Sequence, residues 1–419
     1  MRILLTSAAG DGIWFVWLLG HEGHDVDWIV ASERDADTLK GIVKPPLSRV
    51  PDPSRYDLVV FDTSGMGESA DYARSVTPTI GASAYADRLE HDRVFGIQEM
   101  ERVGIKVPPW EAFDTPAAGI AFLNKNKKRY VLKPIGEAPS DATYVSKSAE
   151  DMIHFIETKL DKKVKSFVLQ EFVSGTEVST EAWWTGTEFV ALNHTLELKK
   201  FMAGDVGPNT GAAATVVWMP AKPNAIYQQG LGRMASGLGG LPFVGMLDLN
   251  TIVTDGEVYG LEWTPRFGYE GTCNLTRLLD RGLGEFMFAV ATGTNPTLGQ
   301  PRSRFSATVR LSVPPYPSAE FSRKRIQVPI AGIDLERLDS FVLYDVMKDG
   351  DGALVTGGGY NVIGSPIGCG ETLSGAFDEV ESAIARLDIP NLQYRTEACK
   401  CIGERYATLQ NGGWLRPIG

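Results

Sequence analysis

The 419-residue sequence predicts an α/β protein that becomes α+β toward its C-terminus. Strand and helix signals alternate through residues 1–100, which is the pattern of a parallel sheet covered by helices. Residues 101–300 mix strands and helices. Residues 301–419, which begin after an expected linker at 300–304, contain mainly short strands and glycine turns. We therefore expect three regions, divided near residues 100 and 300.

The first region is expected to alternate strands and helices around a tight first turn. Its predicted elements are a strand at 2–6, a helix at 13–19, strands at 26–30, 57–61 and 79–81, and a helix at 90–103 ended by Gly104. The first turn contains Gly10-x-Gly12, but Phe15 stands where a dinucleotide-binding fingerprint needs its third glycine. A plain strand–helix turn is therefore favoured over an NAD site.

The later regions mix both element types. The elements predicted there are a strand at 130–134, a helix at 147–158 with Ser148 as N-cap, a strand at 167–173, a hairpin of 177–184 and 188–193, a polar glycine-rich loop at 199–211, and a helix at about 372–387. No internal repeat is visible, so each region is interpreted by itself.

The most informative segment is a predicted hairpin over residues 245–268 that carries Asp248 and Glu262. Each acid lies in an apolar run that predicts a strand, and Asp255-Gly256 between the runs predicts the turn. Two acids brought together in this way indicate a divalent metal, and carboxylate-held Mg²⁺ usually accompanies substrate phosphates. The alternative is an exposed Asp and a Glu in an ordinary salt bridge. The two acids share a sheet face only if the connection has an odd number of residues or a bulge intervenes.

Composition limits the classes of function. The net charge of −11 argues against nucleic acid as a partner, because phosphate binding relies on surfaces rich in Lys and Arg. No apolar run is long enough for a membrane span, and no leader segment is expected at the N-terminus. The 4 cysteines and 5 histidines lack the spacing of zinc ligands, so reduced thiols and a cytoplasmic location are expected.

Charged residues of the middle region meet the requirements of a nucleoside triphosphate site. Lys133, Lys199 and Lys200 could neutralise phosphates, while Glu171 and Glu177 lie near a strand end where an acid could meet ribose hydroxyls. Each lysine taken alone would ordinarily be a surface residue. Their order ahead of the Asp-Glu hairpin favours the nucleotide interpretation. The sequence contains no P-loop, no Gly-x-Ser-x-Gly elbow and no His-Glu-x-x-His motif.

The order of these motifs resembles the ATP-grasp superfamily and, within it, the glycinamide ribonucleotide synthetase family, over nearly the whole chain. The most specific match is the segment 204–211, which is close to that family's Gly-Asp-x-Gly-Pro-Asn-Thr-Gly. Other similar segments are 80–95 before the ATP-grasp domain, 168–179 at the adenine hinge, 262–268 at the metal-site strand, and Tyr316-Pro317, Gly358-Gly359, Tyr394-Arg395 and Ile402-Gly403 near the C-terminus.

The resemblance implies an ATP-grasp fold with an N-terminal parallel-sheet α/β domain at 1–100, an ATP-grasp domain at 101–300 with a small lid subdomain at about 120–190, and a C-terminal mixed domain at 301–419. It also implies a reaction in which ATP phosphorylates a carboxylate and an amine attacks the acyl phosphate, giving an amide, ADP and phosphate. The implied cofactors are ATP and Mg²⁺ (or Mn²⁺). The implied partners are a small acid (glycine or another amino acid) and a small amine with or without a phosphate, in a monomer or homodimer.

The resemblance also assigns roles residue by residue. The nucleotide would be contacted by Arg93, Lys133, Gln170, Glu171, the backbone of Val173, Glu177 and Asn209. The metal would be held by Asp248 and Glu262. Arg266 would stabilise the acyl phosphate, with Lys199 and Asp205 on the acceptor side. Catalysis would then consist of positioning and charge neutralisation, with no covalent enzyme intermediate.

The sequence departs from the family pattern around the phosphates and the acceptor. The changes are Arg93 for the first ATP lysine, Glu137-Ala-Pro-Ser-Asp141 for a glycine-rich lid loop, Thr264 for a metal-binding asparagine (a position that Asn250 could partly cover), Tyr269-Glu-Gly271 for Asp-Pro-Glu, and Gly211-Ala-Ala-Ala for Gly-Gly-Met-Gly. They leave two substrates open: the ligase makes glycinamide ribonucleotide itself, or it is a divergent relative that joins a different acid or amine. The alternative is a catalytically degenerate ATP-binding protein, and a Rossmann-type oxidoreductase comes third.

Overall fold

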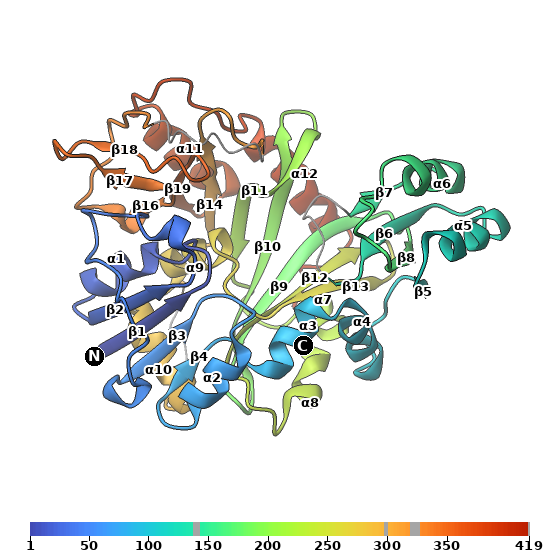
Figure 1. Ribbon diagram of the computed structural model, residues 1–419, viewed down its shortest axis with the longest axis horizontal. Coiled ribbons are helices and arrows are strands. Elements are labelled where there is room, and N and C mark those ends of the chain that lie inside the picture. Colours follow the sequence, from blue (N-terminus) through green and yellow to red (C-terminus); the bar gives the residue numbers. More distant parts are fainter. Residues whose placement is uncertain (137–142, 297–300, 319–326, 418–419) are drawn as a thin grey trace.

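The computed structural model describes residues 1–136, 143–296, 301–318 and 327–417. The lid loop at 137–141 and the first residue of the linker predicted at 300–304 lie outside these ranges. The described chain is α/β and contains a nine-stranded sheet, two four-stranded sheets and a two-stranded ribbon. Figure 1 shows the N-terminal sheet on one side of the long central strands and a small separate sheet on the other.

The N-terminal region forms the predicted parallel sheet. Its elements are β1 (Arg2–Ser7), α1 (Trp14–His21), β2 (Asp25–Val30), β3 (Leu58–Phe61), α2 (Gly67–Arg74) and β4 (Thr79–Ile80), with the strand order β2-β1-β3-β4. β1 and β3 are apolar and almost fully buried, as strands of a covered parallel sheet are. The strand order reverses between them, so their carboxyl ends flank the position where open α/β sheets bind ligands.

Phe15, at the position where a dinucleotide fingerprint needs glycine, is a core residue. Its side chain is 1% exposed, and its ring lies 5.2 Å from that of Phe267, which in turn lies 5.6 Å from Trp183 in the central sheet. The position where a fingerprint needs glycine therefore holds a core residue that joins the N-terminal region to the central sheet. The strand and the helix predicted on either side of the turn are present as β1 and α1.

The single helix predicted over 90–103 is wrong, because the chain forms two helices there. They are α3 (Ala84–His91) and α4 (Arg93–Arg102). Asp92 separates them, and its side chain accepts a hydrogen bond from the backbone N–H of Phe95 at 3.0 Å. An acid that caps the first turn of a helix in this way starts a new helix instead of continuing the previous one. Gly104, at φ +80°, follows α4 as predicted.

Residues 110–171 build a small sheet with a core of its own. Its elements are β5 (Trp110–Phe113), α5 (Pro116–Lys125), β6 (Tyr130–Pro134), β7 (Tyr144–Val145), α6 (Ala149–Thr158) and β8 (Phe167–Glu171), with the strand order β5-β8-β6-β7. Ser148 caps α6 as predicted, accepting from Asp151 N at 3.2 Å. Leu132, Met152 and Leu169 lie in this core and are fully buried. We propose that this unit is the lid subdomain expected at about 120–190.

The central sheet combines strands from the middle and C-terminal regions. Its strands are β9 (Thr176–Trp184), β10 (Phe189–Met202), β11 (Val206–Trp218), β12 (Gly245–Val253), β13 (Val258–Thr264), β14 (Phe305–Val309), β15 (Leu311–Ser312), β16 (Phe341–Leu343) and β19 (Val362–Gly370). β14 pairs with β11, so the sheet continues across residue 300. We continue to propose domain boundaries near residues 100 and 300, although the sheet itself crosses residue 300.

The remaining elements surround this sheet. They are α7 (Ala225–Gln229), α8 (Ala235–Leu238), α9 (Glu270–Leu278), α10 (Leu283–Thr292), the ribbon strands β17 (Val346–Lys348) and β18 (Leu354–Thr356), α11 (Leu373–Ile384) and α12 (Ala398–Asn411). The predicted helix at 372–387 corresponds to α11, whose N-cap is Thr372. α12 was not predicted, because only Ala398, Ile402 and Leu409 are buried along its length and its apolar stripe is correspondingly weak.

The polar loop predicted at 199–211 is wrong, because most of this segment is strand. β10 continues to Met202 and β11 begins at Val206, so they form a long hairpin with Lys200 opposite Asn209. The pairing register shifts on both sides of Lys200, so extra residues fit into the hairpin without ending its two strands. Among the described residues, no helix combines the length and apolar character that crossing a membrane would require.

The separate core of residues 110–171 leads to a stability prediction. Leu169→Ala should destabilise this unit by about 2–5 kcal/mol, because a buried leucine is lost and a cavity remains. Hydrogen exchange should then accelerate across residues 110–171 and stay unchanged in β9 and β12. Val145→Ala, at a position 47% exposed in the same unit, is the control and should change little. Faster exchange throughout the chain would contradict an independent unit.

Candidate functional site

The β12–β13 hairpin contains a bulge that sets the direction of its acids. Asn250 lies opposite Glu262, and the register shifts by one residue immediately beyond this pair, at Leu261. Asp248 therefore lies opposite Thr264. Because directly opposed residues share a face and alternate residues return to it, Asp248 and Glu262 lie on the same face. The structure meets the condition that the sequence imposed, and it does so with a bulge.

The same face continues acidic across β9 and β10. Asp248 lies opposite Glu181 of β9, whose carboxylate accepts hydrogen bonds from Asn193 Nδ2 at 2.8 Å and Thr195 Oγ1 at 2.9 Å. Burial raises the pKa of Glu181, and it raises the pKa of Glu197 on β10 to about 7. A face with so many carboxylates can keep them ionised only if cations reach it.

Lysine and arginine side chains from separate elements supply these cations. Burial acts to raise the pKa of Glu262, but Lys133, Lys199, Arg93 and Arg266 together lower it below its usual value. Arg93 Nη1, from α4, lies 3.9 Å from Glu262 Oε2. Glu262 is thus a carboxylate held in its charged form by cations that are distant in the sequence.

Lys133 and Lys199 approach this face from different sheets. Lys133, on β6 of the small sheet, is 7% exposed and donates from Nζ to the carbonyl of Leu261 at 3.0 Å, at the bulge. Burial lowers the pKa of Lys133 to about 8. Lys199, on β10, lies with Nζ 2.6 Å from Glu177 Oε1. Burial acts to lower the pKa of Lys199, but Glu177 and other acids raise it overall, so Lys199 stays charged.

Arg266 lies where two cavities come close together. Its Nε donates to Glu90 Oε1 at 2.9 Å, and it lines a cavity of about 450 Å³ together with Arg93, Glu262 and Thr264. Its guanidinium carbon also lies 5.9 Å from the ring centre of Tyr269, which lines a second cavity of about 590 Å³. Arg266 is thus placed between the acidic hairpin and a separate chamber.

The residues assigned to the adenine hinge lie at and beyond the end of β8. Gln170 is 2% exposed, and its Nε2 has no hydrogen-bond partner among the described residues. Glu171 pairs with Lys128 at 2.5 Å, and Val173 follows where the chain crosses to β9. Asn209 lies elsewhere, because it lines the 590 Å³ cavity and not the cavity beside Glu262. Gln170 therefore has a free donor, whereas Asn209 is separated from the hinge.

The donor set on the hairpin fits Mg²⁺. Asp248 is 6% exposed, its Oδ1 has no hydrogen-bond partner, and burial raises its pKa, so a cation is needed for it to ionise. Among the described residues, no three His, Cys, Asp or Glu side chains converge closely enough to hold a metal by themselves. This agrees with Mg²⁺, which is usually held by one or two carboxylates together with waters and substrate phosphates. Asp248 and Glu262 would hold it.

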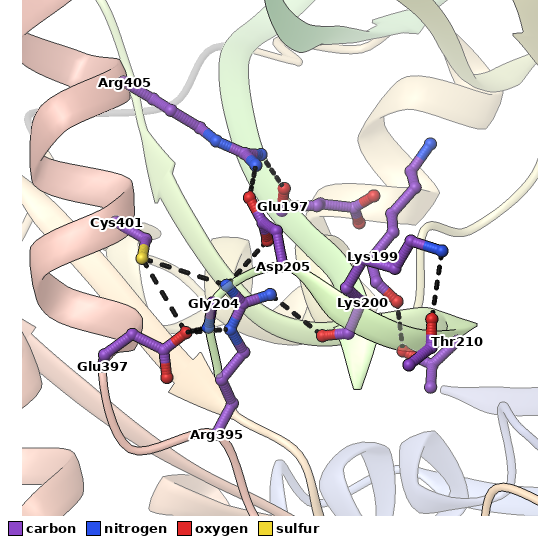
Figure 2. A network of polar contacts seen from close by, with 11 residues as sticks. Glu197, Lys199, Lys200, Gly204, Asp205, Thr210, Arg395, Glu397, Cys401 and Arg405 are labelled. Atoms are coloured by element: carbon purple, nitrogen blue, oxygen red, sulfur yellow. Dashed lines mark hydrogen bonds and ion pairs between the residues drawn. The ribbon is translucent and has the colours of Figure 1, made fainter. Parts of the chain in front are cut away.

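Asp205 belongs to a network of hydrogen bonds and ion pairs. Among the described residues, none of its contacts is with the β12–β13 hairpin. Figure 2 shows Arg395 between the tip of the β10–β11 hairpin and the segment before α12. Arg395 is 2% exposed and donates to Asp205 Oδ1 at 2.7 Å, to Glu397 Oε1 at 2.8 Å and to the carbonyl of Lys200 at 2.9 Å. Arg405 adds a contact to Asp205 Oδ2 at 3.3 Å. The network fixes the hairpin tip to the C-terminal region.

Comparison with known proteins agrees with this arrangement. Residues 91–272 match the family model described as "Phosphoribosylglycinamide synthetase, ATP-grasp (A) domain". The phosphoribosylamine–glycine ligase of Leifsonia xyli subsp. xyli is 27% identical over 413 residues, covering 94% of this chain and 94% of that protein. The corresponding ligase of Thermotoga maritima is 28% identical over 323 residues, covering 74% of this chain and 77% of that protein.

Solved structures extend the likeness to the fold. The crystal structure of phosphoribosylamine–glycine ligase from Thermotoga maritima matches with a TM-score of 0.73 at 23% identity, covering 94% of this chain and 99% of that chain. Biotin carboxylase from Campylobacter jejuni, in a complex described as β-γ-ATP, matches with a TM-score of 0.64 at 14% identity, covering 99% of this chain and 98% of that chain. The chain has the ATP-grasp fold and resembles phosphoribosylamine–glycine ligases.

Sequence reasoning missed Glu90, Glu181 and Glu197. Glu181 left a signal, because Glu177-x-Ser179-x-Glu181 places polar residues at every second position of an otherwise apolar strand. Glu90 left none, since its role depends on Arg266, which lies far along the chain. Only folding brings these two side chains together.

The network around Arg395 leads to a second stability prediction. Arg395→Met should lower the free energy of unfolding by about 1.5–3 kcal/mol, because hydrogen bonds to charged groups contribute about that much. Urea denaturation of the full chain measures this effect. Arg405→Met, at a side chain that is 30% exposed, is the matched control and should have a smaller effect. Equal effects of the two substitutions would show that Arg395 has no special place in the network.

Proposed function

We propose that this chain is an ATP-dependent, ADP-forming ligase that joins a carboxylate to an amine through an acyl phosphate. The observation that carries the proposal is the convergence of cations around Glu262. Arg93 Nη1 lies 3.9 Å from Glu262 Oε2, Lys133 Nζ donates to the carbonyl of Leu261 at 3.0 Å, and Arg266 lines the same cavity as Glu262. Such a cation set around a carboxylate is what a metal-bound triphosphate requires, because the charge of the transferred phosphoryl group must be neutralised. Relatives named as phosphoribosylamine–glycine ligases support the same reaction.

In this proposal the small sheet closes the nucleotide site. Lys133 and Arg93 would contact the phosphates, and the free amide of Gln170 and the backbone of Val173 would meet the base. Arg93 Nε donates to the carbonyl of Pro134 at 3.0 Å, so the guanidinium is oriented beside Lys133. This supports an arginine in the place of the expected first lysine, since its fork is fixed by a backbone acceptor while the charge is kept.

The remaining roles follow from position. Glu177 would accept hydrogen bonds from the ribose hydroxyls, and Lys199 would face the acceptor. Because these two side chains form an ion pair at 2.6 Å, a bound ligand would contact both while they remain paired with each other. Arg266, oriented by Glu90, would stabilise the acyl phosphate. For Asp205, the contacts with Arg395 and Arg405 support a positioning role instead of a catalytic one.

Bound Mg²⁺ would neutralise the charge of the phosphates. The chain's own residues would do the rest: Asp248 and Glu262 orient the nucleotide end, and Arg266 binds the anionic oxygens that develop nearby. No nucleophilic side chain is required, because catalysis by positioning and fixed charge suffices for phosphoryl and acyl transfer. The amine then attacks the acyl carbon, forming the C–N bond as the bond to phosphate breaks.

The proposed partners are small molecules. One is an acid such as glycine or another amino acid, and the other is an amine. The 4 cysteines are all free thiols, which supports a proposed cytoplasmic location with a reducing environment. A monomer or a homodimer remains the expected assembly.

A catalytically degenerate ATP-binding protein is the second candidate, and Thr264 is the observation that favours it. Thr264 lies opposite Asp248 and offers a neutral hydroxyl where the family is expected to place an amide ligand. Asn250 lies opposite Glu262, but its Oδ1 accepts from Ser179 Oγ at 3.1 Å. The metal site then depends on two carboxylates, so turnover has to be measured directly.

Release of ADP tests the ligase proposal. ADP should appear with ATP, Mg²⁺ and one particular acid–amine pair from a panel, and Glu262→Gln should lower this rate about 100-fold or more. Glu257→Gln is the matched control on the same hairpin, since Glu257 pairs with Lys106 at the surface at 2.9 Å. ATP binding without turnover for any pair would favour the degenerate protein.

The pKa of Lys133 gives a pH prediction. Only the protonated lysine attracts phosphate, and its pKa is lowered to about 8. The charge is therefore present below pH 8 and lost above it, so ATP affinity should fall by up to about tenfold per pH unit above the pKa. Lys133→Arg should bind ATP with little change between pH 7 and 9, because arginine stays charged. Parallel pH profiles for both proteins would rule out a role of this ammonium.

A further inference from the structure

His91 lines the cavity of about 450 Å³ that contains Glu262. It is the last residue of α3, and Asp92 starts a new helix directly after it. Glu90 and His91 at the end of one helix and Arg93 at the start of the next therefore line the same cavity. The helix dipole would account for a histidine at the end of α3, but it would not account for the place of this side chain in the cavity.

The imidazole also lies near the loop that follows β3. His91 Nε2 lies 3.8 Å from the point where a Cβ atom on Gly65 would be. Asp87 of α3 holds this loop, because its carboxylate accepts from the backbone N–H of Gly65 at 2.8 Å and of Gly67 at 2.6 Å. The loop begins at the carboxyl end of β3, the end at which open α/β sheets bind ligands. His91 thus lies between the carboxyl end of the N-terminal sheet and the cavity of Glu262.

The ring of His91 is available to a ligand. No hydrogen bond, ion pair or ring contact joins it to another residue of the described chain, and the residue is exposed. A neutral imidazole accepts at one ring nitrogen and donates at the other. A molecule that enters the cavity can therefore use both functions.

The neighbouring groups are poorer proton acceptors. Among the described residues that line the cavity, Glu90, His91 and Glu262 carry a group that can take up a proton. Glu90 Oε1 accepts from Arg266 Nε at 2.9 Å, and although Glu90 Oε2 has no partner, an ion pair with arginine makes the whole carboxylate a weak base. Glu262 is the proposed metal ligand and lies near Arg93. Imidazole is the side chain most often used for proton transfer in catalysis, so His91 is the favoured acceptor.

We propose that His91 is the base that takes a proton from the incoming amine, so that the amine can attack the acyl phosphate. This role rests on the proposed ligase function and adds a proton acceptor to it. Near neutral pH an aliphatic amine is mainly an ammonium ion, as the side chain of lysine is, and an ammonium nitrogen has no lone pair for the attack. A base beside the acyl phosphate removes this barrier.

The protons and electrons of the step balance. The imidazole takes one proton from the ammonium group and becomes imidazolium, and the lone pair left on nitrogen attacks the acyl carbon. As the bond from that carbon to the phosphate oxygen breaks, the nitrogen gives its second proton to the departing phosphate, and a neutral amide remains. The imidazolium then returns its proton to water, so His91 is ready for the next turnover.

Hydroxylamine separates this role from any earlier step, because near neutral pH it is mostly unprotonated and attacks acyl phosphates without a base. The full chain is given ATP, Mg²⁺, each acid of the panel and either hydroxylamine or a protonated amine, with ammonium chloride and glucosamine among the amines, and ADP release is measured. His91→Ala should lower release with the protonated amine about 100-fold or more, as the loss of a general base does. Release with hydroxylamine should change little. His154→Ala, at an exposed position on α6, is the matched control and should change neither rate.

The pH profile gives a second measurement that a purely structural role would not alter. In His91→Ala only the free amine reacts, so ADP release should rise about tenfold per pH unit below the pKa of the amine. The rate of the unsubstituted chain should rise less steeply over the same range, because the imidazole supplies the base. Imidazole added to the solution should restore part of the rate of His91→Ala.

Three outcomes would overturn the role of His91 and leave the ligase standing. Equal loss with hydroxylamine and with the protonated amine would place His91 in nucleotide binding or phosphoryl transfer. No loss with either nucleophile would show that another group takes the proton, and ADP release by the unsubstituted chain with hydroxylamine alone would show that no base operates. If the unsubstituted chain released ADP with neither kind of nucleophile, the ligase itself would be rejected, and the role of His91 with it.

Discussion

The whole arrangement depends on keeping Glu262 ionised on the acidic face of the central sheet. A carboxylate in such a place ordinarily takes up a proton, and burial does raise the pKa of its neighbours Glu181 and Asp248. Glu262 is the exception because its side chain is 45% exposed and because cations reach it, among them Lys133 of the small sheet and Arg93 of α4. One electrostatic requirement therefore joins the small sheet, which has a core of its own, to the central sheet.

The same requirement gives the small sheet a functional meaning. Lys133 is buried, yet its ammonium donates to a backbone carbonyl at the β13 bulge, so the contact joins the small sheet to β13. On the opposite side, the rings of Phe15 and Phe267 join the N-terminal turn to the residue next to Arg266. The proposed nucleotide site and Arg266 are thus positioned by one strand and the few residues that follow it.

Several sequence predictions failed for a common physical reason. The segment 199–211 is polar and glycine-rich, which is typical of loops, but pairing across the sheet made most of it strand. The acceptor-side role of Asp205 stays a prediction, but its carboxylate pairs with Arg395, 190 positions later in the chain, a partner that no local pattern indicated. The break at Asp92 was missed although an acid is a good N-cap, because apolar spacing favours helix on both sides of it. Local patterns do not reveal partners that are distant in the sequence.

The sequence by itself determined the parallel N-terminal sheet, the ATP-grasp resemblance and the requirement that Asp248 and Glu262 share a face only with an odd-numbered connection or a bulge. These follow from periodicity, motif order and the two-residue repeat of a strand, which are all local properties. Only the tertiary structure decided that the bulge lies at Leu261, that Lys133 meets this bulge, and that Glu90 orients Arg266. Charge balance and burial are sums over neighbours in space, and the chain acquires those neighbours only when it folds.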